Sequence, residues 1–143
     1  MWIVYAVGAS MFWGLSYVFS AETYKHISVF TAVAISSFVT GAVALIAAFW
    51  IGTLGADIKT LTAYSPVSMY FLGAIVAGLL GEFFIAFAIA GKNATLAGMI
   101  EVSYPIFIAL FSYIFFKEVI SFQTYMGGLL IFIGVFVIYY THA

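Results

Sequence analysis

The chain consists of long apolar runs separated by short polar segments. Each of five runs is close to the roughly 20 residues that a helix needs to cross the hydrocarbon core of a bilayer. They predict membrane spans over residues 2–19, 29–51, 67–90, 94–116 and 122–140, joined by connections that hold nearly all the charged side chains. We therefore expect an all-α membrane protein, a bundle of five transmembrane helices forming one domain over residues 1–143.

Three of these spans carry a small residue at every fourth position, which places the small residues on one helix face. In lipid there is little hydrophobic drive between helices, so such faces are where backbones approach closely. The pattern predicts close helix packing without indicating a function. The stripes are Ala6, Ser10 and Gly14; Ala32, Ser36 and Thr40; and Gly73, Ala77 and Gly81.

The composition agrees with a membrane protein, because 66% of the residues are hydrophobic, 6% are charged and the mean hydropathy is +1.24. Soluble domains carry about 25% charged residues. A net charge of −1 gives no basis for nucleic-acid binding, and the lack of cysteine excludes disulfides and thiolate metal sites. We also find no metal-binding, nucleophile-elbow or phosphate-loop motif, so we expect no enzyme, no cofactor and no metal. The first run lacks the basic residues that begin a signal peptide, and we expect it to be a retained span.

The four lysines are divided evenly between the two sides of the membrane. Five spans put the termini on opposite sides, here named the N side and the C side, with Lys59 and Lys117 on the N side and Lys25 and Lys92 on the C side. An excess of basic residues normally sets orientation, and this chain has none. One explanation is that loop length or the N-terminal amine sets the orientation. The other is that the chain inserts in both orientations and pairs as an inverted dimer, a plan that transporters use as inverted repeats.

Two acidic residues, Glu82 and Glu101, fall inside predicted spans. A carboxylate in hydrocarbon costs about 2.5–3.5 kcal/mol, so such residues face a cavity or a partner. Both lie about 10–12 Å below the C side, on two spans joined by a tight turn. Two carboxyls at close range can share one proton near neutral pH, which suits proton coupling. The alternative is a protonated glutamate that only stabilises helix packing.

Pro105 marks the same region, because a proline leaves the backbone carbonyl four residues earlier, that of Glu101, without its helical partner. Ser103 and Tyr104 lie beside this break. Irregular backbone at membrane depth lines a cavity or is buried in protein, so the break indicates either a site or a packing kink.

Trp13 lies inside the first span, about 9 Å below the C side and therefore at the depth of the two glutamates. With Tyr17 it could form an aromatic wall that attracts an organic cation beside a carboxylate. The alternative is that Trp13 faces lipid or is packed. The candidate substrate-binding and proton-coupling residues are thus Glu82, Glu101, Trp13, Tyr17, Ser103, Tyr104 and Pro105.

Several motifs resemble the EamA domain of the drug/metabolite transporter superfamily, and together they cover nearly the whole chain. The segment Phe12-Trp13-Gly14-Leu15-Ser16 resembles the start of that domain. Residues 86–140 are similar to its second half: an alanine-rich helix end, a short polar turn, a proline motif, a glutamate after the next helix and a glycine-rich last span. The residues concerned are Ser103-Tyr104-Pro105, Glu118, Gly127, Gly128 and Gly134.

The resemblance implies a transporter. Most members carry two five-helix units as inverted repeats, whereas this sequence resembles the single-unit prokaryotic branch, in which an antiparallel homodimer replaces the fused pair. It implies export of metabolites or drugs, often coupled to protons, by a multipass protein of a prokaryotic plasma (inner) membrane. Small multidrug transporters use a glutamate in the first helix. This chain has none within the first predicted span, residues 2–19, so we assign any carboxylate role to Glu82 or Glu101. We expect a proton-coupled small-molecule exporter working by alternating access; the alternatives are a non-transporting scaffold or subunit, and an uncoupled facilitator.

Overall fold

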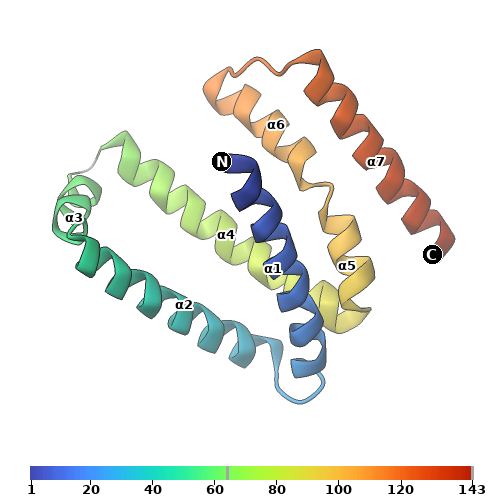
Figure 1. The fold of residues 1–143 in the computed structure, drawn as a ribbon, viewed down its shortest axis with the longest axis horizontal. Helices are drawn as coiled ribbons and strands as arrows, with labels where there is room; N and C mark the ends of the chain where they lie inside the picture. The colour runs from blue at the N-terminus through green and yellow to red at the C-terminus, as the bar shows by residue number, and fades with distance from the viewer. Residues whose placement is uncertain (64, 143) are drawn as a thin grey trace.

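The computed structural model describes residues 1–63 and 65–142 and is built of helices, which make up 86% of it; no strand occurs among those residues. Figure 1 shows the helices running back and forth between two ends of the molecule. In chain order they are α1 (Trp2–Thr23), α2 (Val29–Ile51), α3 (Leu54–Thr62), α4 (Pro66–Gly91), α5 (Ala94–Glu101), α6 (Tyr104–Phe116) and α7 (Phe122–His142).

The expected five membrane helices are confirmed by length and apolar composition. They are α1, α2, α4, the segment Ala94–Phe116 that joins α5 to α6, and α7 up to Thr141. α1 has 22 residues and is therefore about 33 Å long, enough to cross a bilayer. The expected break at Pro105 is also present, since α5 ends at Glu101 and α6 begins at Tyr104 with the proline in its first turn.

Polar and flexible residues at the helix ends explain where the chain turns. The side chains of Ser28 and Asn93 accept hydrogen bonds from the backbone N–H groups of Thr31 (3.2 Å) and Leu96 (2.8 Å), which caps α2 and α5. Gly52 ends α2 with a φ of 83°, a left-handed conformation that costs glycine little. These residues set where α2 begins and ends and where α5 begins.

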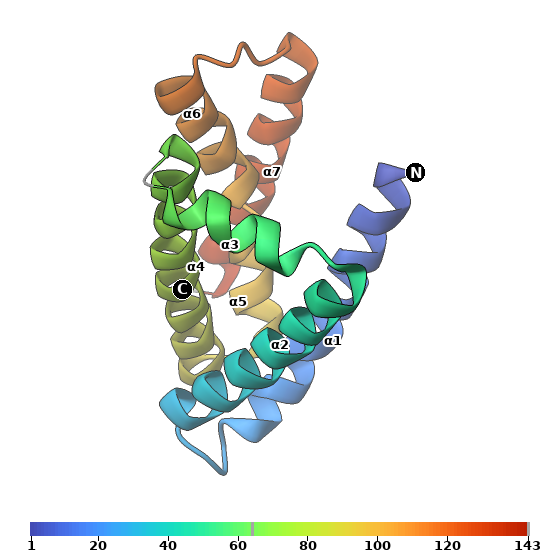
Figure 2. The same cartoon turned by 90° about the vertical axis from the view of Figure 1, so that its left-hand side faces the viewer.

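The short helix α3 lies in a segment that the sequence analysis treated as a connection. Figure 2 shows it running across the bundle between the ends of α2 and α4, and it contacts both helices. Leu54, Ile58 and Leu61 recur at helical spacing, while Asp57 and Lys59 fall between them, so the helix is amphipathic. A hydrogen bond from Ser68 Oγ to the Leu61 carbonyl (2.7 Å) joins α3 to the start of α4.

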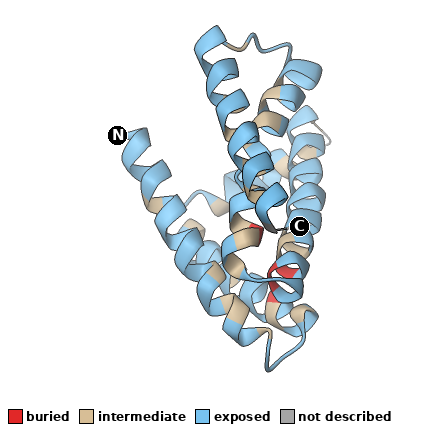
Figure 3. Ribbon diagram, turned by 90° about the vertical axis from the view of Figure 1, so that its right-hand side faces the viewer, coloured by how far each residue is buried: buried red, intermediate tan, exposed pale blue. Residues whose placement is uncertain are grey.

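The helices pack most closely near the C side. α4 contacts α1, α2, α3 and α5, and α5 in turn contacts α1 and α7, so α4 and α5 form the centre. The buried residues of the described chain are Val33, Ala86, Ile89 and Ala97, all within the C-side portions of α2, α4 and α5. Figure 3 shows them grouped in the lower part of the molecule while the helices separate above. Large apolar side chains elsewhere are exposed, as lipid tails permit.

Among the described residues, the glycines of the small-residue stripes make no close contact with a neighbouring helix. A Cβ atom added at Gly14, Gly73 or Gly81 would meet nothing within 4 Å. The stripe on α2 faces a cavity instead of a neighbouring helix, since Ala32, Ser36 and Thr40 belong to its wall. Small side chains suit an open space as well as a close contact, and the sequence pattern does not separate the two cases.

Candidate functional site

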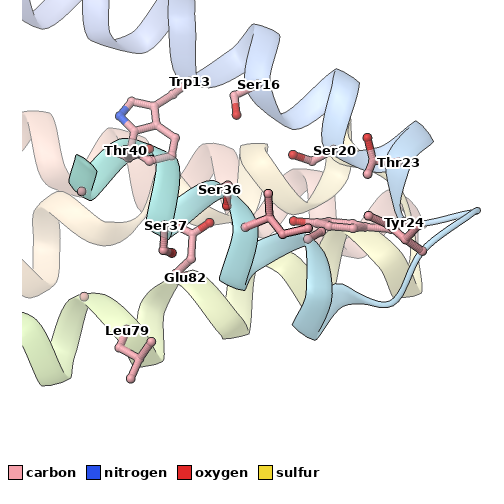
Figure 4. A pocket seen from close by; sticks show the side chains of 15 residues that line it. Trp13, Ser16, Ser20, Thr23, Tyr24, Ser36, Ser37, Thr40, Leu79 and Glu82 are labelled. Carbon is pink, nitrogen blue, oxygen red and sulfur yellow. The ribbon is translucent and has the colours of Figure 1, made fainter. Parts of the chain in front are cut away.

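A cavity of about 820 Å³ lies between α1, α2 and α4. It extends from the connection between α1 and α2 to the middle of the spans, and its residues come from these three helices and that connection. The residues are Trp13, Ser16, Ser20, Thr23, Tyr24, Ile27, Ala32, Ile35, Ser36, Ser37, Thr40, Gly41, Gly78, Leu79 and Glu82. Figure 4 shows the polar side chains of α1, α2 and α4 around this space.

The wall of the cavity is polar because helical periodicity brings hydroxyl residues to one face of each helix. On α1, Ser16, Ser20 and Thr23 follow one another at spacings of four and three residues, which keeps them on one side. On α2, Ser36 and Thr40 are likewise four residues apart. The cavity at membrane depth is therefore lined by hydrogen-bonding groups as well as by apolar ones.

Glu82 supplies the charge of the cavity and comes from α4. Glu82 is half-buried, and it is the one residue with an ionisable carboxyl among the described residues that line the cavity. Trp13, on α1, lines the same cavity and is 52% exposed. Trp13 and Glu82 therefore line one cavity, and among the described residues no hydrogen bond joins their side chains. An aromatic wall beside the carboxylate stays a prediction.

Glu101 is held by α1. The Tyr17 hydroxyl donates a hydrogen bond of 2.5 Å to Glu101 Oε2, and both residues are half-buried. The Tyr17 ring rests on Gly98, one helical turn before Glu101: a Cβ atom added at Gly98 would lie 3.3 Å from Tyr17 Cδ2. A glycine on α5 therefore allows the close approach through which α1 reaches the second carboxylate. The Trp13 and Tyr17 rings meet edge to face, with centroids 6.0 Å apart.

The two glutamates occupy neighbouring but distinct places. Glu82 lines the cavity, whereas Glu101 lies outside its lining, and no hydrogen bond joins the two carboxyls in the described part of the chain. The Tyr17 hydroxyl joins α1 to Glu101, while Glu82 belongs to the cavity wall. The sharing of one proton between the two carboxyls stays a prediction from the sequence.

The remaining candidates lie at the helix break. Ser103 precedes α6, and neither its hydroxyl nor any side chain caps that helix. Ser103, Tyr104 and Pro105 are absent from the residues that line the described cavity. The structure therefore brings Trp13 and Glu82 to one cavity, pairs Tyr17 with Glu101 beside it, and leaves the break on the far side of Glu101.

The hydroxyl residues of the cavity were not selected from the sequence. Ser20 and Ser37 received no role, and Ser36 and Thr40 were assigned to a packing stripe. A usable signal existed, because hydroxyl residues recur at helical spacing on the first two spans at the depth of Glu82. Isolated serine and threonine residues in spans usually bond to their own helix, so the recurrence on two adjacent helices is the informative feature.

Comparison with known proteins agrees with a membrane transporter. No curated protein and no solved structure matches the chain. The EamA-like transporter family matches it over residues 1–140, which is nearly its whole length and includes all five membrane helices. The chain therefore belongs to the EamA-like transporter family.

Proposed function

We propose that the protein carries small polar molecules across a prokaryotic plasma membrane by alternating access, with export coupled to protons. The observation that carries the proposal is the cavity of about 820 Å³, which places hydroxyl groups and Glu82 between membrane-length helices. Ligand sites for small molecules typically have volumes of about 300–1,000 Å³. Because a carboxylate at membrane depth is costly, its presence on a cavity wall favours a role in binding or coupling.

The coupling step that we propose uses both carboxyls. A substrate and a proton compete for Glu82, so protonation from one side releases substrate and deprotonation on the other side restores the binding form. Glu101 acts through Tyr17: an ionised carboxylate accepts a stronger hydrogen bond from the hydroxyl than a protonated one does. Protonation of Glu101 would loosen the link between α1 and α5, and α1 also forms one wall of the cavity. Protonation would thus favour one of the two conformations over the other. Alternating access requires such a difference between its two states.

We further propose that two copies pair in opposite orientations. The even division of lysines supports this, as do the apolar side chains exposed on α6 and α7, which a second copy can cover. The chain has no cysteine, so single cysteines can be introduced in the connections without background. A membrane-impermeant thiol reagent applied to intact cells should label part of the His26→Cys protein and part of the Val119→Cys protein. Complete labelling at one position and none at the other would contradict dual orientation.

The transport proposal is tested in proteoliposomes that contain a pH-sensitive dye. A panel of amino acids, amines and sugars is added, and substrate-stimulated proton flux is recorded. Glu82→Gln and Glu101→Gln should lose this flux. Asp57→Asn is the matched control, since Asp57 is exposed on α3, outside the membrane-length helices and the cavity lining, and it should keep the flux.

Each other result has a definite meaning. Normal flux in both glutamine variants at every pH would refute the coupling role of the carboxyls. Movement of a compound that ignores the pH gradient would indicate a facilitator. If no compound of the panel moves, the transport proposal fails and a non-transporting membrane subunit becomes the better description.

A further inference from the structure

The cavity between α1, α2 and α4 presents one kind of charge and many hydroxyl groups. Glu82 is the charged residue among the described residues that line it, and no lysine or arginine is in that set. Six serine and threonine residues and Tyr24 supply hydroxyls: Ser16, Ser20, Thr23, Ser36, Ser37 and Thr40. An ionised carboxylate without a basic neighbour favours a cation as its ligand.

Two of these hydroxyls are already occupied by their own helices. Thr23 Oγ1 donates to the Phe19 carbonyl at 2.9 Å, and Ser36 Oγ donates to the Val33 carbonyl at 3.1 Å. Ser10, on the same helix as Thr23 but outside the cavity, behaves in the same way and donates to the Ala6 carbonyl at 3.1 Å. Bonding back to the preceding turn thus occupies some of the hydroxyls in these helices.

The other four serine and threonine hydroxyls remain available. Within the described residues, the side chains of Ser16, Ser20, Ser37 and Thr40 make no hydrogen bond. Ser16 and Ser20 belong to α1, while Ser37 and Thr40 belong to α2 (Figure 4). Figure 4 also shows the Glu82 side chain extending from α4 toward α2, near Ser36 and Ser37. Hydroxyls left free on two helices beside a carboxylate form a site for a ligand that carries several hydrogen-bonding groups.

We infer that this cavity binds a hydroxylated organic cation, of the amino-alcohol or amino-sugar class, as the transported molecule. The ammonium group pairs with Glu82, and the ligand's hydroxyls bond to the free serine and threonine hydroxyls of α1 and α2. Trp13 lines the same space and offers a ring face for the cation or for the C–H face of a sugar ring. The inference rests on the proposed function, since it names the substrate class of the same cavity.

The selectivity follows from the same groups. A site that hydrogen-bonds ligand hydroxyls strongly disfavours an analogue that lacks them, because its own polar groups then stay unpaired. A cation without hydroxyls should therefore bind weakly. A neutral polyol lacks the charge for Glu82, and an anionic polyol is repelled by it. These three kinds of molecule are the comparison set for the test.

The test measures equilibrium binding to the purified protein by the fluorescence of Trp13, in a Trp2→Phe, Trp50→Phe background that leaves one tryptophan. The added probes are glucosamine, tetramethylammonium, glucose and gluconate. We expect saturable binding of glucosamine, with the other three at least about tenfold weaker. Equal binding of tetramethylammonium, or tighter binding of glucose or gluconate, would overturn the inference. This comparison uses one protein and needs no cavity variant.

Variants then locate the contacts. Ser16→Ala and Ser20→Ala should each weaken glucosamine binding by about three- to tenfold, the range expected for one hydrogen bond. Ser10→Ala is the matched control and should bind as the parent does, because its hydroxyl is bonded to its own helix outside the cavity. Unchanged binding in both cavity variants would contradict the assigned contacts.

The failure of this inference differs from the failure of the proposed function. If glucosamine binds selectively but never drives proton flux, the binding chemistry stands and the transport proposal is wrong. If amino acids or neutral sugars drive flux and glucosamine does not bind, the protein is a transporter and the assigned substrate class is wrong.

Discussion

Replacing Tyr17 by phenylalanine removes one hydroxyl group and keeps the ring that rests on Gly98. The hydroxyl donates the hydrogen bond of 2.5 Å to Glu101 Oε2, which joins α1 to α5. Tyr17→Phe therefore isolates the bond from the packing. Because both residues are half-buried, water and lipid headgroups reach the site only in part.

The expected loss of stability is modest. Hydrogen bonds between helices in membrane proteins contribute about 0.6 kcal/mol on average and up to about 1.7 kcal/mol. The short bond to a carboxyl oxygen places this one in the upper part of that range, and we expect Tyr17→Phe to lower the free energy of unfolding by about 1 kcal/mol. Glu101→Leu alone should cost a similar amount, and the double variant should lose little more than either single one.

The assay is a double-mutant cycle based on unfolding in mixed micelles, followed by circular dichroism as the denaturing detergent fraction is raised. A coupling energy of about 0.6–1.7 kcal/mol between the two positions is expected. Glu101→Gln is the control, since its amide oxygen still accepts the bond and the coupling should persist. If the effects of Tyr17→Phe and Glu101→Leu add to within about 0.3–0.5 kcal/mol, the positions are independent and the reasoning is refuted.

The other predictions concern single sites. Gly98→Ala places a Cβ atom 3.3 Å from Tyr17 Cδ2 and should be less stable than Gly81→Ala, which meets nothing within 4 Å, by about 1 kcal/mol in the same unfolding assay; equal stability would show that the ring yields freely. Ser68→Ala removes both the bond to the Leu61 carbonyl and the capping contact at the start of α4, so it should lower stability by about 1 kcal/mol and speed hydrogen exchange in α3, and unchanged exchange would count against the link. Pro105→Ala should raise amide protection between Glu101 and Tyr104, because the missing N–H is restored; protection as low as in the parent would mean that the break has another cause. Lys25→Ala should leave stability unchanged, since the Lys25–Glu22 ion pair has side chains 65% exposed; a measurable loss would contradict this.

The sequence predicted the parts of the fold that depend on one helix at a time. Apolar run length identified the five membrane helices, and Pro105 identified the break between α5 and α6, because both effects act within a few residues. α3 was missed although Leu54, Ile58 and Leu61 show helical spacing. A helix of 9 residues has little stability of its own, and α3 depends on its contacts with α2 and α4.

The site was predictable only in part for a related reason. The depth of Trp13, Glu82 and Glu101 follows from counting residues along a span. The face that a helix turns toward its neighbours does not follow from such a count, because lipid and cavity walls accept similar small residues. The sequence thus placed the two glutamates at one level, and the structure adds their different surroundings: Glu82 lines the cavity and Glu101 accepts a hydrogen bond from the Tyr17 hydroxyl.

The position of the buried residues has a mechanical consequence. Val33, Ala86, Ile89 and Ala97 all lie toward the C side, so the helices pack together at that end and lie further apart at the other. A unit built in this way would pivot at its packed end. In an antiparallel pair the two pivots would lie in opposite leaflets. One unit could then close at its open end while the other unit opens at the opposite side. Two rigid hinges set head to tail could then rock between inward and outward states, with no helix unwinding in either.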